Sequence, residues 1–217
     1  DPVLWEIILL SGKVSGIVLV FSALLGVPFG AFLGLVRFRG RRFVQALIYT
    51  GMGLPPVVAG LGVYLLLSRA CILGPLNLPF VPELFTVPAM IVAQVIIATP
   101  LVAGYTMSAV AEVAPDLRLQ VRSLGATPLQ VTMAVMREAR LGLIVALVGG
   151  LGSIISEVGA VMMVGGNIDG QTRVLTTAIM LETRRGNFSL AIGLGMVLLL
   201  LSFLINYGVT QLQGKGN

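Results

Sequence analysis

Residues 84–111 read LFTVPAMIVAQVIIATPLVAGYTMSAVA, a run of 28 residues that contains no Asp, Glu, Lys or Arg. A helix needs about 20 consecutive apolar residues to cross the hydrocarbon core of a bilayer. Four further stretches have similar lengths, and all five together contain a single charged residue, Glu157. The sequence therefore predicts an all-α membrane protein with five transmembrane helices. We place these helices at approximately 14–36, 44–68, 85–111, 141–165 and 187–210, within one domain that covers residues 1–217.

The composition excludes several other classes of protein. Charged residues make up 11% of the chain and the mean hydropathy is +1.01, whereas soluble domains carry about 25% charged residues. A single cysteine, Cys71, and no histidine leave no disulfide framework and no zinc or other metal site. The sequence has neither a catalytic triad nor the Gly-x-x-x-x-Gly-Lys-Ser/Thr loop that binds nucleotide phosphates. We therefore expect no enzyme activity and no cofactor in this chain.

The net charge of +5 comes from basic residues in loops beside the spans. Such loops are typical of membrane topology rather than of a nucleic-acid surface, so we expect no nucleic-acid partner. If the N-terminus is outside, the cytoplasmic segments hold nine of the fourteen basic residues, including four arginines within 37–42. Because basic residues favour the cytoplasmic side, we predict that the N-terminus is outside and the C-terminus is cytoplasmic.

Glycines and prolines interrupt the predicted spans. The first span carries Gly26, Gly30 and Gly34, and the second carries Pro55 and Pro56. Small residues at this spacing allow close helix packing, and a pair of prolines kinks or breaks a helix. Broken helices at membrane depth also line substrate routes in transporters. We interpret the two prolines as a gating or bracing element, which is compatible with tight packing of the bundle.

The segment 112–140, between the third and fourth spans, is the longest polar stretch. Residues 115–124 read as a short helix, and Gly125 follows where a left-handed residue ends a helix. Thr127 and Pro128, with a Gln at the third helical position, then form a capping box for a second helix. This pattern predicts a rigid helix–Gly–helix unit. Two interpretations stay open: interfacial helices that stabilise the bundle, or a lever that docks a soluble partner.

The centre of this segment reads RSLGATP at 122–128, with Val135 ten residues after the glycine. It resembles the EAA loop of ATP-binding-cassette importer permeases of the type I fold, which forms a coupling helix that docks on a cytoplasmic ATPase. LQV at 119–121 stands where that family has Glu-Ala-Ala, and Arg137-Glu138 stands where it has Leu-Pro. The resemblance implies the type I fold for this chain. It also implies ATPase-coupling contacts at Arg122, Ser123, Leu124, Gly125, Ala126, Thr127, Pro128, Val135, Arg137 and Glu138.

Other stretches narrow the resemblance to oxyanion permeases. LPPVVAG at 54–60, with GPL at 74–76, is similar to molybdate-type permeases. GGNI at 165–168, RVLTT at 173–177 and GNF at 186–188 are similar to the tungstate permease subgroup. The resemblance covers essentially the whole chain and implies an importer of tungstate. Molybdate or another oxyanion is the alternative.

The resemblance also implies the partners. Two copies of the chain would form the translocation pathway and alternate between outward- and inward-facing states. Two cytoplasmic ATP-binding subunits, which hold ATP and Mg²⁺, would dock on the loops, and an extracytoplasmic oxyanion-binding protein would deliver the anion. The chain would be a multi-pass protein among the lipids of a prokaryotic cytoplasmic (inner) membrane. The alternative from another class is a stand-alone secondary transporter or channel, whose spans more often contain several ionisable relays.

Polar side chains within the spans are candidates for the anion pathway. Four of them are Gln94, Thr99, Ser153 and Ser156. They either donate weak, reversible hydrogen bonds to the anion or form ordinary interhelical contacts. Glu157 would repel an anion if it were ionised in the pathway; it is protonated, paired with an arginine, or turned away as a structural or gating brace, which we favour. Arg173 lies just outside the fourth span, where it attracts the anion at the entrance or anchors the chain at the interface.

Overall fold

The computed structural model describes residues 2–68 and 81–214, and these residues form ten α-helices and no strand. The all-α fold predicted from the sequence is confirmed. Cys71 and the stretch 74–76 lie outside the described residues. The helices are α1 (Pro2–Leu35), α2 (Arg41–Met52), α3 (Pro56–Leu67), α4 (Val87–Glu112), α5 (Pro115–Ser123), α6 (Pro128–Glu138), α7 (Arg140–Ser156), α8 (Gly159–Gly165), α9 (Leu175–Arg184) and α10 (Phe188–Gly214).

Among the described residues, α1, α4 and α10 are each long and apolar enough to cross a membrane. Two bent pairs meet the same test when each pair is counted as one span: α2 with α3, bent by 99°, and α6 with α7, bent by 67°. Counted in this way, the described residues supply up to five spans. The structure divides two of the helices expected from the sequence. The stretch 44–68 becomes α2 and α3, and the stretch 141–165 becomes α7 and α8.

The division between α2 and α3 follows from the two prolines. Pro56 is the first residue of α3, and Pro55 before it has φ −59° and ψ 124°, outside the helical region. A steric clash disfavours helical angles for a residue that precedes proline, so α2, which ends at Met52, does not continue into α3. Gly51 of α2 lies against Pro100, where a Cβ would come within 2.9 Å of the proline ring. The break therefore lies close to the middle of α4.

The division between α7 and α8 lies at Glu157. Helix α7 ends at Ser156, Glu157 has an extended ψ of 125°, and α8 begins at Gly159. The Glu157 Oε1 atom accepts a hydrogen bond from the backbone N–H of Ala160 at 2.9 Å. This bond satisfies a free donor in the first turn of α8 and places an acidic group at the positive end of that helix. The apolar run from 141 to 165 therefore contains a helix end with its own cap.

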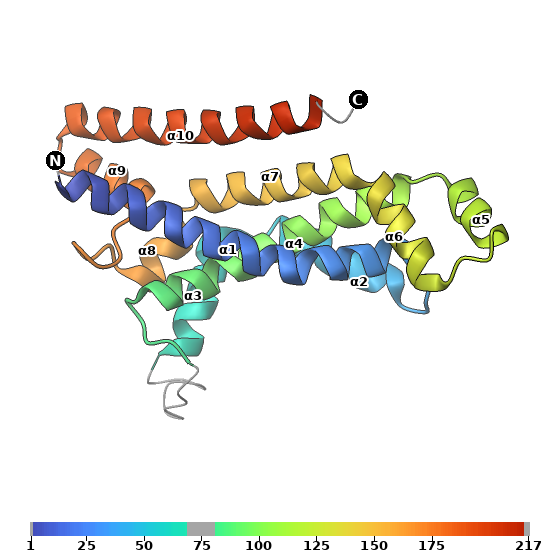
Figure 1. Cartoon of the computed structure of the whole chain (residues 1–217). Helices are drawn as coiled ribbons and strands as arrows, with labels where there is room; N and C mark the ends of the chain where they lie inside the picture. Colours follow the sequence, from blue (N-terminus) through green and yellow to red (C-terminus); the bar gives the residue numbers. More distant parts are fainter. Residues whose placement is uncertain (1, 69–80, 215–217) are drawn as a thin grey trace.

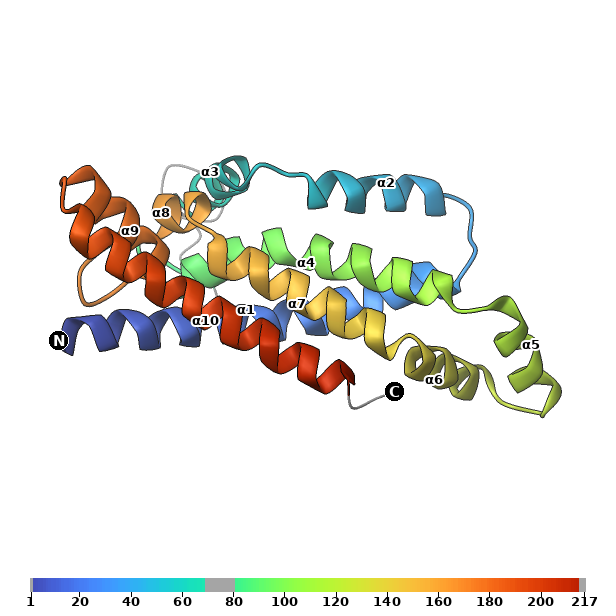
Figure 2. The ribbon, with the colours of Figure 1, turned by 90° about the horizontal axis from the view of Figure 1, so that it is seen from above.

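Helices α1 and α4 form the most extensive helix pair of the molecule (Figures 1 and 2). A Cβ on Gly26 would come within 2.9 Å of Val102, and a Cβ on Gly34 would come within 2.8 Å of Val110. Gly30 lies between them and is equally close to α4. The close packing predicted from this glycine spacing is confirmed, because any side chain at these positions would separate the two backbones.

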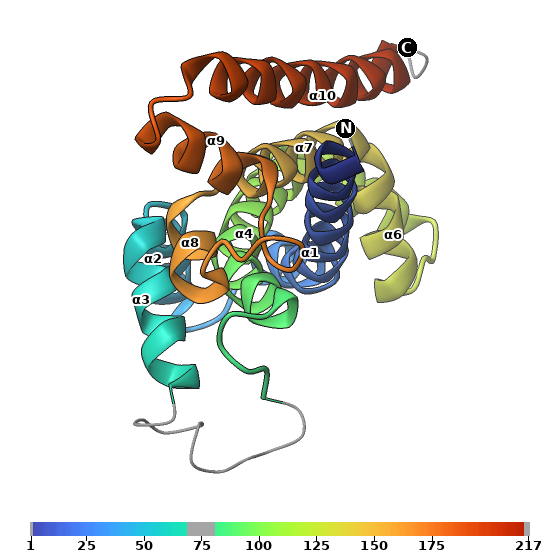
Figure 3. The same ribbon diagram turned by 90° about the vertical axis from the view of Figure 1, so that its left-hand side faces the viewer.

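The functional elements lie at the two ends of the bundle. Helices α5 and α6 lie at the end where α1 stops, and the loop between α8 and α9 lies at the opposite end, beside the beginning of α1 (Figures 1 and 2). Helix α10 lies at the margin of the bundle and contacts mainly α9 and α7 (Figure 3). Its outer apolar side chains are more than half exposed: Ile192, Met196, Leu199, Leu200, Phe203, Leu204 and Tyr207. This face is available to lipid or to a second copy of the chain.

Candidate functional site

The α5–α6 segment folds as its local sequence predicts. Helix α5 ends at Ser123, and Gly125 has φ +80°, the left-handed conformation that terminates a helix. The hydroxyl of Thr127 accepts a hydrogen bond from the N–H of Gln130 at 3.4 Å, and the Gln130 side chain accepts one from the N–H of Thr127 at 2.8 Å. Pro128 occupies the first position of α6. The predicted helix–Gly–helix unit and its capping box are confirmed.

One side of this segment is fixed to the membrane helices. Val131 is 6% exposed and Val135 is fully buried. Val135 belongs to an apolar cluster that includes Ala31 of α1 and Val110 of α4. In α5, Nη2 of Arg118 donates a hydrogen bond to the carbonyl oxygen of Val110 at 3.0 Å. The segment is therefore packed against α1 and α4, and Val135, predicted as a coupling residue, lies inside the bundle rather than on an outer surface.

The other side of the segment presents apolar side chains that no described residue covers. Leu124 is 85% exposed, Leu119 and Leu129 are each 64% exposed, and Met133 is 50% exposed. We call these four residues the coupling patch. Exposed apolar side chains on a polar segment mark a surface for a protein partner or for the membrane. The other predicted coupling residues around it are exposed, namely Arg122, Ser123, Gly125, Thr127, Pro128, Arg137 and Glu138, and Ala126 is half-buried.

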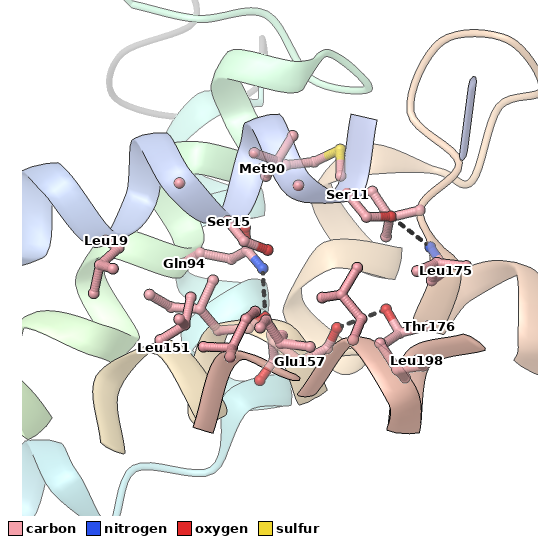
Figure 4. Close-up of a pocket in the computed structure, with 18 residues that line it drawn as sticks. Ser11, Ser15, Leu19, Met90, Gln94, Leu151, Glu157, Leu175, Thr176 and Leu198 are labelled. Carbon is pink, nitrogen blue, oxygen red and sulfur yellow. Dashed lines mark hydrogen bonds between the residues drawn. The ribbon is translucent and has the colours of Figure 1, made fainter. Parts of the chain in front are cut away.

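A cavity of about 220 Å³ lies between α1, α4, α7, α9 and α10 (Figure 4). Five polar residues line it: Ser11, Ser15, Gln94, Glu157 and Thr176. The remaining lining is mainly aliphatic and includes Leu19, Met90, Leu151 and Leu198. The structure therefore places two residues predicted from the sequence, Gln94 and Glu157, at one cavity inside the bundle.

Hydrogen bonds beside this cavity hold the end of α7 in place. Nε2 of Gln94 donates to the carbonyl oxygen of Ile154 at 3.2 Å, and Oγ1 of Thr176 donates to the carbonyl oxygen of Glu157 at 3.0 Å. Together with the Glu157 cap on α8, these bonds join α7 to α4, α8 and α9. Gln94 is 5% exposed, and its Oε1 atom is buried without a hydrogen-bond partner among the described residues.

Sequence reasoning missed the contribution of α1 to this cavity. The hydroxyl of Ser11 accepts a hydrogen bond from the N–H of Leu175 at 2.8 Å, which ties the start of α9 to α1. The stretch 1–13 was not assigned to a span because it contains charged residues, yet α1 already begins at Pro2. The repeated Ser-Gly pairs at 11–12 and 15–16 are the signal that points to this face of the helix.

Other predicted pathway residues do not line this cavity. Ser156 donates a hydrogen bond back to its own helix at 2.8 Å, Ser153 is half-buried, and Oγ1 of Thr99 is buried without a partner among the described residues. Arg173 lines a separate cavity of about 300 Å³ beside the start of α1. Its guanidinium forms an ion pair with Asp169 at 2.7 Å. Of the candidates predicted from the sequence, Gln94 and Glu157 therefore lie at the first cavity and Arg173 at the second, whereas the other three line neither.

The starts of α3 and α8 lie against each other. A Cβ on Gly159 would come within 2.7 Å of the Val57 side chain. Glu157 caps α8, whereas α3 has no side-chain cap. Val57 and Val58 in the first turn of α3 are 56% and 54% exposed. Helix α3 therefore presents an uncapped N-terminal end, with its positive partial charge, on an exposed face near the middle of α4.

Comparison with known proteins identifies the family in which this arrangement of broken helices and a capped loop occurs. Residues 26–214 match the family described as the inner membrane component of binding-protein-dependent transport systems. The chain belongs to this family. It is therefore a permease subunit of the ATP-binding-cassette importers, located in the inner membrane.

Relatives and a solved structure agree with this assignment. A tungstate uptake system permease from Peptoclostridium acidaminophilum is 40% identical over 213 residues, which cover 98% of this chain and 91% of the relative. A probable anion permease from Haloferax volcanii is 43% identical over 198 residues, covering 89% and 83%. A molybdenum transport permease from Escherichia coli is 27% identical over 209 residues, covering 91% of each. An inward-facing methionine transporter structure has the same fold, with a TM-score of 0.76, 21% identity and coverage of 98% and 96%.

Proposed function

We propose that this chain is the transmembrane permease subunit of an ATP-driven tungstate importer. The assignment of tungstate as the substrate rests on one observation. The chain is 40% identical, over 98% of its length, to a permease whose name specifies tungstate uptake. The relative named for molybdenum transport shares less of the sequence, with 27% identity. Tungstate and molybdate have the same charge and shape, so a separate extracytoplasmic binding protein supplies most of the selection between them.

The coupling patch is the proposed docking surface for a cytoplasmic ATPase subunit, which carries ATP and Mg²⁺. Leu124 and Leu129 are largely exposed, and a partner that covers them removes apolar surface from water. The same segment is tied to α1 and α4 through Val135 and Arg118. Movement of the ATPase subunits therefore reaches the membrane helices through a rigid connection. ATP hydrolysis belongs to those separate subunits.

We place the anion route beside the uncapped start of α3. The positive end of a helix attracts an anion without the deep binding of an arginine, which would slow release. Pro55 and Pro56 create this end by breaking the helix inside the membrane. In a two-fold dimer of the chain, both copies contribute an α3 start to one shared route. Alternating access then requires that the two broken helices change their exposure between the outward- and inward-facing states.

Glu157 acts in this proposal as a brace. Its carboxylate accepts a hydrogen bond from Ala160, and its backbone carbonyl accepts one from Thr176. The negative charge therefore faces the positive end of α8, which offsets part of its repulsion toward a passing anion. Arg173 is paired with Asp169 at the opposite end of the bundle from α5 and α6. There it attracts the anion at the entrance to the route.

Co-purification from the native membrane tests the proposal. The tagged chain should recover an ATP-binding subunit, and ATP hydrolysis by the reconstituted complex should rise with tungstate in the presence of the external binding protein. Stimulation by molybdate but not by tungstate would correct the substrate. A lone oligomer that transports the anion without ATP would instead support a stand-alone secondary transporter.

A charge introduced into the coupling patch separates docking from folding. Leu124→Glu together with Leu129→Glu should abolish recovery of the ATP-binding subunit while the chain stays in the membrane. The control Gln120→Glu adds a negative charge at a nearby exposed position on α5, outside the patch, and should retain the subunit. Equal retention by the double variant and the control would reject the patch as the docking surface.

A further inference from the structure

The turn between α1 and α2 contains a concentration of unpaired positive charge. Four arginines, Arg37, Arg39, Arg41 and Arg42, lie within six residues, and we call them the arginine turn. The sequence has no acidic residue between Glu6 and Glu83. Within the described part of the chain, none of the four arginines forms an ion pair. Like charges this close repel one another, so the turn needs a counter-charge from outside the chain.

The packing of α1 places this turn at the edge of the membrane-spanning region. Gly34, one residue before the end of α1, lies against Val110, two residues before the end of α4. Beyond Glu112 the chain leaves the apolar helix and enters the polar α5–α6 segment. The arginine turn therefore lies level with the point where the apolar helices end, which is where lipid phosphates lie in a bilayer.

Local structure holds the turn in one shape. Gly40 has φ +92°, and the N–H of Arg41 donates a hydrogen bond to the carbonyl oxygen of Phe38 at 3.2 Å. The ring of Phe38 lies 5.7 Å from the ring of Phe32 on α1. Phe43 on the first turn of α2 is 69% exposed, so its apolar ring is free to contact lipid acyl chains. The charged side chains are thus presented from a fixed turn flanked by aromatic rings.

The arginine side chains offer donors that the chain does not use. Arg37, Arg39 and Arg42 are exposed. Arg41 is half-buried, and its Nε atom is buried without an acceptor among the described residues. The buried Nε atom is out of reach of an outside ligand, so the exposed guanidinium groups of Arg37, Arg39 and Arg42 are the ones that can bind one. A phosphate oxygen is the acceptor that a guanidinium binds best, often through two parallel hydrogen bonds. The ligand that fits this turn is therefore an anion with several oxygen atoms.

We propose that the arginine turn binds the headgroup of an anionic phospholipid in the leaflet on the α5–α6 side. The turn connects two helices embedded in the membrane, so lipid phosphates are the anions that it meets at highest local concentration. Phe38 and Phe43 lie beside the arginines, where they contact the upper part of the acyl chains. A bound headgroup offsets the repulsion among the arginines and fixes α2, which leads into the break at Pro55.

Lipid binding to the purified full-length chain tests this proposal without any transport assay. The chain in nonionic detergent is titrated with phosphatidylglycerol or with phosphatidylcholine, and bound lipids are counted by native mass spectrometry. The wild type should bind phosphatidylglycerol with at least tenfold higher affinity than phosphatidylcholine, and added salt should weaken that preference. Because the readout needs no ATPase subunit and no oxyanion, its failure leaves the proposed transport function untouched.

Matched variants separate this site from general attraction of anions. The triple variant Arg37→Gln, Arg39→Gln and Arg42→Gln should lose at least tenfold in affinity for phosphatidylglycerol. Replacing the same three residues with Lys should retain most of the binding. The control removes equal charge at the other end of the bundle through Lys13→Gln, Arg184→Gln and Arg185→Gln, and should bind like the wild type.

Three outcomes would overturn the proposal. One is equal binding of the two lipids by the wild type. Another is unchanged phosphatidylglycerol binding in the Arg→Gln triple variant. A third is displacement of the lipid by millimolar inorganic phosphate, which would assign the turn to a free anion. If the triple variant does not fold, the single variant Arg42→Gln still has to weaken binding severalfold.

Discussion

Glu157 shows how a carboxylate is accommodated inside a membrane bundle. Among the described residues it forms no ion pair, although it is 6% exposed. Its Oε1 atom instead accepts a hydrogen bond from the first turn of α8. An uncharged amide can accept that same bond. The structural part of its role therefore depends on an acceptor oxygen rather than on the negative charge.

This difference gives a prediction at Glu157. Glu157→Ala removes the cap and should destabilise the chain by about 1 kcal/mol, which lowers the unfolding temperature by about 2–4 °C for a chain of this size. Glu157→Gln keeps an acceptor oxygen and should stay within about 1 °C of the wild type. Thermal unfolding in detergent, followed by circular dichroism, measures both. If the Gln variant is as unstable as the Ala variant, the charge itself is required and the capping account fails.

Gly125 gives a second prediction, because its φ of +80° is unfavourable for other residues while no atom lies within 4 Å of a Cβ added there. The penalty of a substitution is therefore in the backbone, at about 1–2 kcal/mol for an ordinary L-residue. Gly125→Val should reduce transport at least severalfold and uncouple it from ATP hydrolysis, while the chain still inserts. Gly125→Asn should stay within about twofold of the wild type, since Asn tolerates this conformation. Wild-type transport by the Val variant would show that the shape of the turn does not matter.

The α1–α4 helix pair is the element whose packing leaves least room for change. A Cβ on Gly30 would come within 2.8 Å of the Thr106 side chain and still closer to the Ala103 backbone. Gly30→Ala should therefore separate the helices and destabilise the chain by about 2 kcal/mol. The control Gly16→Ala lies on the same helix with no atom within 4 Å of the added Cβ. Thermal unfolding of both variants is the measurement, and equal unfolding temperatures would contradict close packing at Gly30.

The sequence predicted an element correctly where interactions between neighbouring residues set its start and end. The α5–α6 segment was predicted in detail because Gly125, Thr127 and Pro128 specify their backbone angles through short-range chemistry. The break before Pro56 was predictable for the same reason. The break at Glu157 was not, because the run 141–165 remains apolar and only the tertiary contacts show that this carboxylate starts a new helix.

The candidate site was less predictable than the helices. Gln94 could be singled out because it is a polar residue in an apolar run. Its grouping with Ser11, Ser15 and Thr176 required the three-dimensional arrangement of α1, α4 and α9. The coupling patch was missed as a surface for a similar reason. Leu129 and Met133 are exposed because Val131 and Val135 on the other side of α6 are buried against the bundle, and sequence spacing alone does not show which side is covered.

The whole molecule carries its positive charge unevenly. The arginine turn and the α5–α6 segment lie at the same end of the bundle (Figure 1). Eight of the twelve basic residues that the structure describes lie there, and the other four are Lys13, Arg173, Arg184 and Arg185 at the opposite end. Basic residues near short loops favour the cytoplasmic side. The charge distribution therefore supports the orientation in which α5 and α6 face the cytoplasm, where an ATPase subunit can reach them.

Labelling of single cysteines tests that orientation directly. In a chain with Cys71→Ser, which removes the only native cysteine, Arg184→Cys and Ser123→Cys place a thiol at exposed positions on opposite ends of the bundle. A membrane-impermeant maleimide should label Arg184→Cys in intact spheroplasts, and should label Ser123→Cys only after the membrane is opened. The reverse pattern would place α5 and α6 outside the cell. The coupling patch would then be out of reach of any cytoplasmic ATPase, and the proposed mechanism of energy coupling would have to be abandoned even though the fold and the family stand.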